Sequence, residues 1–99
     1  MPIYVQNASG TSRFSKPKNF NSWLEYWEHH CWALSIDKLY KCPACGNLFY
    51  RQDFDGAHVI KVFSKSREMF IVPLCSGCNH RTDFFTVDGR LLLPVPSNL

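Results

Sequence analysis

Two short cysteine pairs constrain this chain more than any other feature of its sequence. Two residues separate Cys42 from Cys45 in the segment CPACG, and Cys75 and Cys78 repeat that spacing in CSGCN. Between the two pairs lie 29 residues. Two intervening residues allow one tight turn to aim both sulfurs at a single ion, and thiolates are ligands that zinc accepts in tetrahedral sites. This doubled arrangement in a short chain predicts a structural zinc ion held by all four cysteines.

The glycines beside the pairs and the start of the chain favour a metal over the alternative of two disulfide bonds. Gly46 and Gly77 supply backbone freedom of the kind that such turns use. The first ten residues, MPIYVQNASG, lack the basic stretch and the apolar run of a secretory signal. We therefore expect a reducing compartment, the cytoplasm, in which thiols remain free to bind zinc.

Length and composition indicate a folded domain. Ninety-nine residues predict a single zinc-binding domain over 1–99, and the metal would add much of its stability. Hydrophobic residues make up 45% of the chain and aromatic residues 15%, which excludes a disordered protein. No apolar run approaches the ~20 residues that a membrane helix needs, so we expect no membrane contact.

The net charge argues against a strongly basic nucleic-acid binder. Four thiolates remove four positive units and a zinc dication restores two, so the formal charge of +3 becomes +1 in the loaded protein. A local basic patch is still compatible with this balance, and ordinary solvated surface is the alternative. The candidate nucleic-acid-binding residues of such a patch are Lys61, Lys65, Arg67 and Arg81.

Residues 21–35 have the pattern of an amphipathic helix, expected over about 22–34. Ser22 followed by Glu25 has the form of a capping box. An aromatic stripe at helical spacing is typical of core packing, here against the zinc-binding part, and a platform for stacking nucleobases is the alternative. The apolar positions of the stripe are Trp23, Leu24, Trp27, Cys31 and Leu34.

A thiol and two imidazoles adjoin one another at the end of this helix. His29, His30 and Cys31 could suggest catalysis or an additional metal. Neighbouring residues on a helix point about 100° apart, so these three side chains cannot converge on one ion. We expect Cys31 to act as a small buried hydrophobic residue and both histidines to be mostly exposed.

After the first cysteine pair the pattern changes to short strands. Strands are expected at 48–50, 57–63 and 69–74, where β-branched and aromatic residues predominate. The last two would form a hairpin around the polar turn at 64–68. The second cysteine pair should then wind into a short helix within 75–85.

The two ends of the chain carry weaker signals. Residues 1–20 are polar and lack periodicity, which indicates an N-terminal arm with a short extended piece at 3–6. Asp88 and Gly89 lie between two apolar pieces, which is a turn signal and predicts a hairpin within the C-terminal segment 86–99.

Three segments within residues 42–82, CPACG, DGAHVIKV and FIVPLCSGCN, resemble the zinc-containing branch of the HNH, or ββα-metal, endonuclease superfamily. The resemblance implies an α+β fold in which residues 42–85 form a treble clef, preceded by the N-terminal helix. A treble clef consists of a zinc-binding turn, a β-hairpin, and a second zinc-binding turn that opens a helix. Nucleases of this family use a histidine as general base and a second divalent ion on the scissile phosphate.

The resemblance assigns catalytic roles to two residues and leaves two positions unmatched. His58 matches the general base, and Asn79 matches a metal-binding position on the helix. Ala57 stands where the family has a metal-binding aspartate, and Phe70 stands where it has an asparagine that orients the base. Alanine cannot bind an ion and phenylalanine cannot orient an imidazole, so the catalytic set is incomplete.

Two neighbouring residues are candidates to replace the missing ligand. Asp55 lies two residues before Ala57 and would share its face of a strand. His80 follows Asn79 and would point about 100° away from it on a helix. For His58, a plain structural role and a place beside the zinc ligands remain open as alternatives to catalysis.

A second likeness covers almost the whole chain. The sequence is similar to a group of small bacterial and phage-type proteins that share SWxxxW, GAHV and IVPLC segments, found here at 22–27, 56–59 and 71–75. This likeness implies that Ala57 and Phe70 are usual for the group. It assigns no activity.

Three functions are compatible with these features. The first is a zinc-stabilised, HNH-like binding module that is catalytically degenerate and contacts DNA, RNA or a protein. The second is an HNH-type endonuclease that uses His58 as general base and binds a second divalent ion. The third is a phage or mobile-element factor that binds a protein partner through the helix tryptophans.

Overall fold

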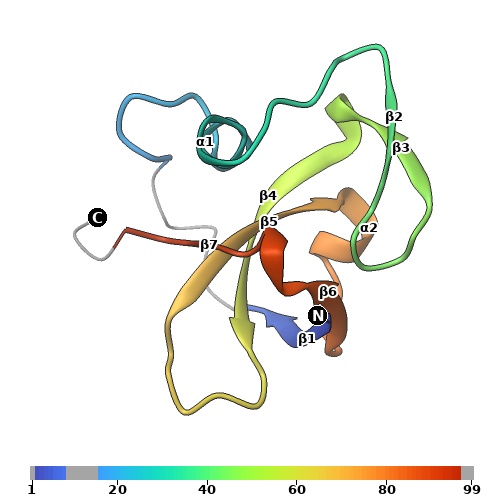
Figure 1. The fold of residues 1–99 in the computed structure, drawn as a ribbon. Coiled ribbons are helices and arrows are strands. Elements are labelled where there is room, and N and C mark those ends of the chain that lie inside the picture. Colours follow the sequence, from blue (N-terminus) through green and yellow to red (C-terminus); the bar gives the residue numbers. More distant parts are fainter. Residues whose placement is uncertain (1, 9–15, 97–99) are drawn as a thin grey trace.

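A five-stranded antiparallel sheet is the largest structural unit of the molecule (Figure 1). The computed structural model describes residues 2–8 and 16–96. The strand order is β6-β1-β4-β5-β7, and every neighbouring pair is antiparallel. The strands are β1 (Pro2–Asn7), β4 (Phe54–Lys61), β5 (Met69–Cys75), β6 (Phe85–Asp88) and β7 (Leu93–Pro94).

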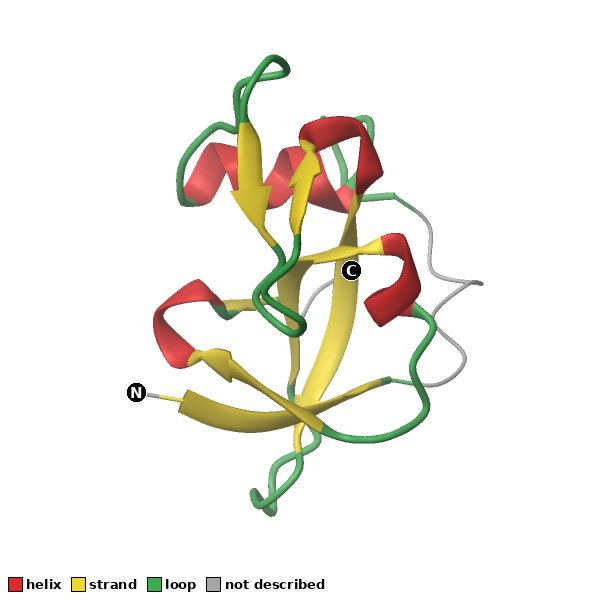
Figure 2. Ribbon diagram, turned by 90° about the vertical axis from the view of Figure 1, so that its right-hand side faces the viewer, coloured by secondary structure: helices red, strands yellow, loops and turns green. Residues whose placement is uncertain are grey.

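A second, two-stranded sheet and a few short helices complete the fold. Figure 2 shows the small hairpin of β2 (Leu39–Lys41) and β3 (Leu48–Tyr50) set off from the larger sheet. The expected α+β class is confirmed. No helix in the described part of the chain is long and apolar enough to cross a membrane. The helical elements are α1 (Trp23–His30), η2 (Arg51–Asp53), α2 (Ser76–Asn79) and η3 (Gly89–Leu91).

The extended piece expected near the N-terminus is an inner strand of the sheet. β1 lies between β4 and β6, with Val5 opposite Lys61 on one side and Phe85 on the other. Val5 is completely buried. β1 is therefore part of the sheet and more than a peripheral arm, and residues 9–15 of the expected arm lie outside the described residues.

Helix α1 begins as its sequence predicts and ends earlier. The Ser22 hydroxyl accepts a hydrogen bond from the Glu25 N–H at 3.1 Å, as an N-cap should. The helix stops at His30 instead of residue 34. The Glu28 carboxylate accepts the N–H of Leu34 at 2.8 Å, which a continuing helix would have directed to a carbonyl one turn back. This bond turns the chain away from the helix axis.

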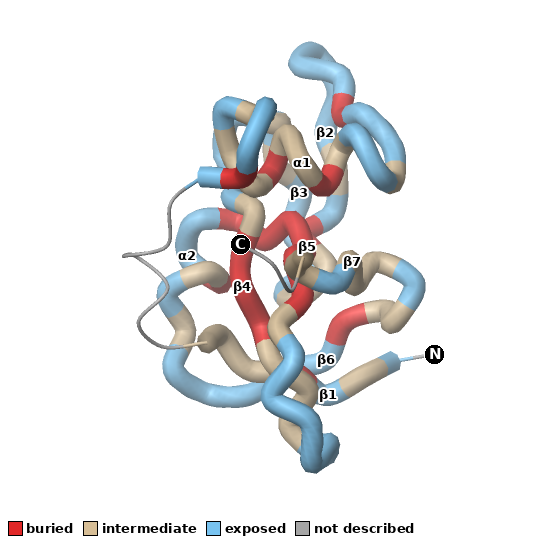
Figure 3. Tube along the Cα trace, turned by 90° about the vertical axis from the view of Figure 1, so that its left-hand side faces the viewer, coloured by how far each residue is buried: buried red, intermediate tan, exposed pale blue. Residues whose placement is uncertain are grey.

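The core follows β4 and β5, where the buried residues concentrate (Figure 3). Trp27 of α1 is 1% exposed, and its indole N–H donates to the carbonyl of Leu91 at 2.8 Å. This bond satisfies the polar end of an otherwise apolar side chain. The expected hairpin of β4 and β5 is confirmed, with Ala57 opposite Val72 and Val59 opposite Phe70.

Gly56 allows α1 to sit directly on β4. A Cβ atom at this position would lie 2.4 Å from the backbone nitrogen of Leu24 and 2.5 Å from the carbonyl carbon of Trp23. Only a residue without a side chain permits this contact between backbones. The SWxxxW and GAHV segments thus pack against each other.

The hairpin expected near the C-terminus does not form. β6 pairs with β1 and β7 pairs with β5, so the two strands lie at opposite edges of the sheet. The Asp88 carboxylate accepts the N–H of Arg90 at 3.0 Å and starts the η3 turn where a hairpin turn was expected. The five Cα–Cα steps from Asp88 to Leu93 span at most about 18 Å. The edges of a flat five-stranded sheet lie about 19 Å apart, so this sheet must curl.

Candidate metal centre and adjoining cleft

The first cysteine pair lies in the turn between β2 and β3. The Cys42 N–H donates to the carbonyl of Asn47, and the Gly46 N–H donates to the carbonyl of Cys42, both at 2.8 Å. Gly46 has a φ of +78°, which residues with a side chain rarely adopt. The glycine expected to shape this turn is therefore confirmed in that role.

The second pair spans the junction of β5 and α2. Cys75 is the last residue of the strand, and Cys78 lies in the single turn of helix that follows. Residues three apart on a helix share a face, so the helical turn itself brings these sulfurs together. Gly77 lies inside α2 without a positive φ, so its expected conformational role is not needed here.

All four sulfurs form one compact group. The Sγ atoms of Cys42, Cys45, Cys75 and Cys78 lie within 4.8 Å of one another. In a tetrahedral zinc–thiolate site with bonds of about 2.3 Å, sulfurs lie about 3.8 Å apart. The Cys45 and Cys75 sulfurs, at 4.0 Å, are close to that spacing. A disulfide would need about 2.05 Å, and all four cysteines are free.

The surroundings of the sulfurs favour a bound cation. Burial alone raises the pKa of Cys42, but N–H groups of Cys75, Cys45 and Ala44 directed at its sulfur outweigh that effect and lower it. Burial together with the neighbouring sulfurs raises the pKa of Cys78 to about 12. Four thiolates this close would need a divalent cation to offset their charge. The four-cysteine group can hold a metal ion such as zinc.

An unpredicted contact ties β1 to the four-cysteine group. The side-chain amide of Asn7 donates to the carbonyls of Cys78 and Arg81, both at 2.9 Å. These carbonyls lie at and just after the last cysteine of the group, so the bonds fix the end of α2 against the sheet. The polar sequence around Asn7 gave no sign of this role.

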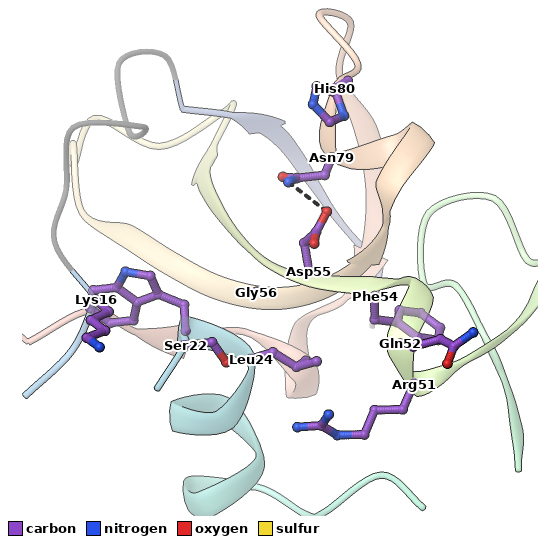
Figure 4. Close-up of a pocket in the computed structure, with 11 residues that line it drawn as sticks. Lys16, Ser22, Leu24, Arg51, Gln52, Phe54, Asp55, Gly56, Asn79 and His80 are labelled. Atoms are coloured by element: carbon purple, nitrogen blue, oxygen red, sulfur yellow. Dashed lines mark hydrogen bonds between the residues drawn. The ribbon is translucent and has the colours of Figure 1, made fainter. Parts of the chain in front are cut away.

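A cleft of about 650 Å³ opens beside the metal centre, between α1, the start of β4 and α2 (Figure 4). The Asn79 amide donates to the Asp55 carboxylate at 3.3 Å across this cleft. The polar and charged residues that line it are Lys16, Ser22, Arg51, Gln52, Asp55, Asn79 and His80.

A hydrogen bond orients His80 at the rim of this cleft. Its Nδ1 lies 2.7 Å from the carbonyl oxygen of Ser76. A carbonyl only accepts, so Nδ1 is the donor in this bond. The two residues considered as replacements, Asp55 and His80, therefore lie around the same cleft.

His58 lies elsewhere. It is 7% exposed, does not line the cleft, and packs against Trp23 with 4.9 Å between ring centroids. Burial lowers the pKa of His58, so its ring is neutral near neutral pH. Asp55 and His58 are three residues apart on β4 and so point to opposite faces of the strand.

The two positions that depart from the HNH pattern are core positions. Ala57 is 1% exposed and Phe70 is 8% exposed. Val59, opposite Phe70 on β4, is completely buried. Alanine and phenylalanine at these positions are explained by packing.

The four basic candidates are not equivalent. Lys65 and Arg67 are exposed on the β4–β5 loop, and Lys61 at its base lies with its Nζ 4.7 Å from the centre of the Phe70 ring. Arg81 donates two hydrogen bonds to Asp83, at 2.9 and 2.7 Å. The charge of Arg81 is therefore offset by a neighbour.

The end of α1 largely matches its prediction. His29 and His30 are exposed, Cys31 is half-buried, and none of the three belongs to the sulfur group. Burial raises the pKa of the Cys31 thiol, which favours its neutral form. A neutral thiol is consistent with the expected role as a small hydrophobic residue. Trp27 is buried and so cannot contact a partner, whereas Trp32 beyond the helix end is 50% exposed.

An ion pair that the sequence did not predict joins α1 to the end of β3. The Arg51 guanidinium donates to both oxygens of Glu28, at 2.6 and 2.9 Å. The two residues are far apart in sequence and no local pattern pairs them. For Gly56, in contrast, a glycine inside a strand pattern was an available signal of close backbone approach.

Comparisons of the chain with family models, with curated proteins and with solved structures found no match.

Proposed function

We propose that this chain is a zinc-stabilised treble-clef module of HNH-like descent that binds nucleic acid and has lost nuclease catalysis. The observation that carries the proposal is the group of four sulfurs, which joins the β2–β3 turn to the start of α2. A metal at this point fastens together two segments that are distant in the sequence.

The order of the elements supports the treble-clef assignment. A cysteine-bearing turn, the β4–β5 hairpin, and a second cysteine pair opening a helix follow one another along the chain. The helix is short, since α2 has four residues. A four-residue helix offers little surface for a DNA groove, so binding in this protein would use other parts of the surface.

The placement of His58 supports the loss of catalysis. A general base must reach the attacking water directly or through one bridging water. His58 is buried under Trp23, and it does not line the cleft that holds Asp55, Asn79 and His80. A structural role for His58 accounts for its burial.

The β4–β5 loop supports nucleic acid as the ligand. Lys65 and Arg67 project into solvent with Lys61 at the base of the loop. Cations on an exposed loop can contact phosphates, and each phosphate contact makes affinity depend on salt.

The test is a binding titration of zinc-loaded protein with fluorescently labelled DNA and RNA, single-stranded and duplex, between about 50 and 200 mM salt. We expect affinity to fall steeply as salt rises, and to fall further in the double variant Lys65→Ala, Arg67→Ala. Lys38→Ala, which removes an exposed lysine far from the loop in sequence, serves as the matched control and should bind as the native chain does. Salt-independent affinity or no binding would contradict the proposal.

A second candidate function, a divalent-ion-dependent nuclease, is favoured by one observation. Asp55, Asn79 and His80 offer oxygen and nitrogen ligands around one cleft, and Asp55 and Asn79 are in contact. Such a site would use these residues in place of the unmatched Ala57.

A supercoiled-plasmid nicking assay with Mg²⁺, Mn²⁺ and Ni²⁺ tests this candidate. Nicking abolished by both Asp55→Asn and His58→Ala would establish an HNH-type reaction with a replaced ligand. Nicking abolished by Asp55→Asn alone would place the chemistry in the cleft without His58. Equal results for all three proteins would remove the nuclease from consideration.

A further inference from the structure

Within residues 2–8 and 16–96, one face of the sheet is left uncovered at β1 and β6. Along both strands buried residues alternate with exposed ones: Val5 and Phe85 are buried, whereas Tyr4 and Thr86, which lie opposite each other, are exposed. Helix α1 covers β4 and β5 instead. The face that carries Tyr4 is therefore open to a ligand.

Three aromatic rings gather on this open face. Tyr4 stands in the middle, with ring centroids 5.5 Å from Phe63 and 5.8 Å from Phe84, both in edge-to-face contact. Phe63 is 80% exposed, Phe84 54% and Tyr4 47%. The rings come from β1, from the β4–β5 loop and from the residue before β6. Single exposed rings scattered over a surface are ordinary, but here two exposed rings both contact a third. Such a contiguous exposed apolar patch is typical of a binding site.

The charges around the rings point to a polyanion. Lys61 lines a shallow hollow of about 300 Å³ together with Tyr4 and Phe63. Lys65 and Arg67 follow Phe63 on the same exposed loop, which contains one acidic residue, Glu68. Beside Phe84, Arg81 and Asp83 offset each other. The surroundings of the rings are therefore net positive.

We infer that Tyr4, Phe63 and Phe84 form a stacking surface for the bases of single-stranded nucleic acid. Lys65 and Arg67, on the loop that also carries Phe63, hold the phosphates of the same strand. This inference rests on the proposed nucleic-acid binding and specifies its substrate class and its surface.

Single strands fit this surface better than a duplex does. In a duplex the base faces are already stacked on each other, so exposed rings find only edges and backbone. In a single strand the faces are free, and stacking on aromatic side chains contributes to affinity with any sequence. Exposed rings bordered by cations combine the two contacts that such a ligand offers.

The test compares a short oligothymidylate with a duplex of the same length by fluorescence anisotropy, using the zinc-loaded full chain. The decisive variant is Phe63→Ser combined with Phe84→Ser, and Phe63→Ser alone is measured beside it. Both positions are exposed, and zinc content and thermal unfolding verify that the fold is kept. Tyr50→Ser is the matched control, because Tyr50 is a 45% exposed ring on the separate β2–β3 hairpin.

We expect the native chain to prefer the single strand and the double variant to bind it about tenfold more weakly or worse. The slope of affinity against salt should stay the same in that variant, because stacking releases no counterions. The slope should decrease in Lys65→Ala, Arg67→Ala, by about 0.7 for each phosphate that the variant no longer neutralises. The Tyr50→Ser control should behave as the native chain.

The contrary outcomes separate this inference from the proposed function. Single-strand binding that the double variant leaves unchanged, or binding to duplex alone, would overturn the stacking surface and leave nucleic-acid binding in place. Binding to neither form would overturn both and leave the three rings as contacts for a protein.

Discussion

The large sheet and the β2–β3 hairpin are stabilised in different ways. The sheet with α1 buries a continuous apolar core, including Trp27, Ile71 and Leu74 at 1% exposure or less. The hairpin exposes much of its apolar surface, with Leu39, Leu48 and Tyr50 each 45–55% exposed. Burial of apolar area is the main driving force for the first region and is scarce in the second. The hairpin therefore has less apolar burial to hold it against the sheet, and the four-cysteine group joins it to the start of α2.

Besides the metal centre, a shielded ion pair links the two regions. Glu28 of α1 binds Arg51, which follows β3, and also the N–H of Leu34. The Glu28 side chain is 9% exposed and that of Arg51 is 30% exposed, so the pair is partly shielded from water. This joint between the regions is electrostatic, in contrast to the apolar contacts within the sheet.

Removing the metal should have the largest effect and should strike the hairpin first. Binding of zinc to a four-cysteine site is coupled to folding by about 10–16 kcal/mol in small domains. After chelation, or in Cys78→Ser, we expect the amides of β2 and β3 to lose protection from hydrogen exchange before those of β4. Cys31→Ser, outside the sulfur group, should keep both metal and protection. Hairpin amides that stay protected from exchange without metal would contradict the claim that the four-cysteine group holds the hairpin in place.

Truncating the core of the sheet region should come next. Trp27→Ala removes a buried ring and its bond to Leu91, and should lower the free energy of unfolding by about 3–5 kcal/mol. Trp32→Ala, which removes a ring that is 50% exposed, should have a much smaller effect. Urea unfolding of the zinc-saturated proteins measures both. Similar losses for the two variants would show that apolar burial does not distinguish the regions.

Breaking the joint between the regions should have an intermediate effect that depends on pH. Glu28→Gln should lower the free energy of unfolding by about 1.5–3 kcal/mol near neutral pH, because it removes hydrogen bonds to a charged group. Burial tends to raise the pKa of Glu28, but the bonds from Arg51 and Leu34 outweigh it and lower the pKa below 4.5.

The direction of that shift sets the pH window. A carboxyl whose pKa is lowered on folding stabilises the protein above its unfolded pKa, and this contribution disappears as pH falls through the folded value. The difference in unfolding free energy between the native chain and Glu28→Gln should therefore shrink below about pH 4.5. Glu68→Gln on the exposed loop is the control. If the difference in unfolding free energy stayed constant as the pH fell, the ion pair of Glu28 and Arg51 would not be its cause.

The contact between α1 and β4 should be sensitive to a single methyl group. Gly56→Ala would force the helix start away from the strand and cost about 1–3 kcal/mol. Gly77→Ala is the matched control, because nothing lies within 4 Å of a Cβ there and alanine favours a helix. Thermal unfolding separates the two, and equal destabilisation by both would show that close approach at Gly56 is not the cause.

Local chemistry in the sequence predicted the elements whose contacts are local. The cysteine pairs, the Ser22 cap and the β4–β5 hairpin each depend on residues within a few positions, so their patterns sufficed. The end of α1 depends on Glu28 reaching Leu34, which competes with the apolar periodicity that favoured a longer helix.

Long-range contacts explain what the sequence could not predict. β6 and β7 lie at opposite edges because their partners, β1 and β5, are far away in the chain, whereas a turn signal reports only on neighbours. The resemblance placed His58 in a catalytic role, but packing under Trp23 determines its environment. The aromatic cluster around Tyr4 likewise joins three separate segments and has no sequence pattern.

X-ray absorption at the zinc edge, on protein purified without added metal, tests the central claim most directly. The account predicts one zinc ion per chain, with four sulfur neighbours at about 2.3 Å and no light-atom ligand. Folded protein without zinc, or zinc bound by nitrogen or oxygen in place of the four cysteines, would contradict it.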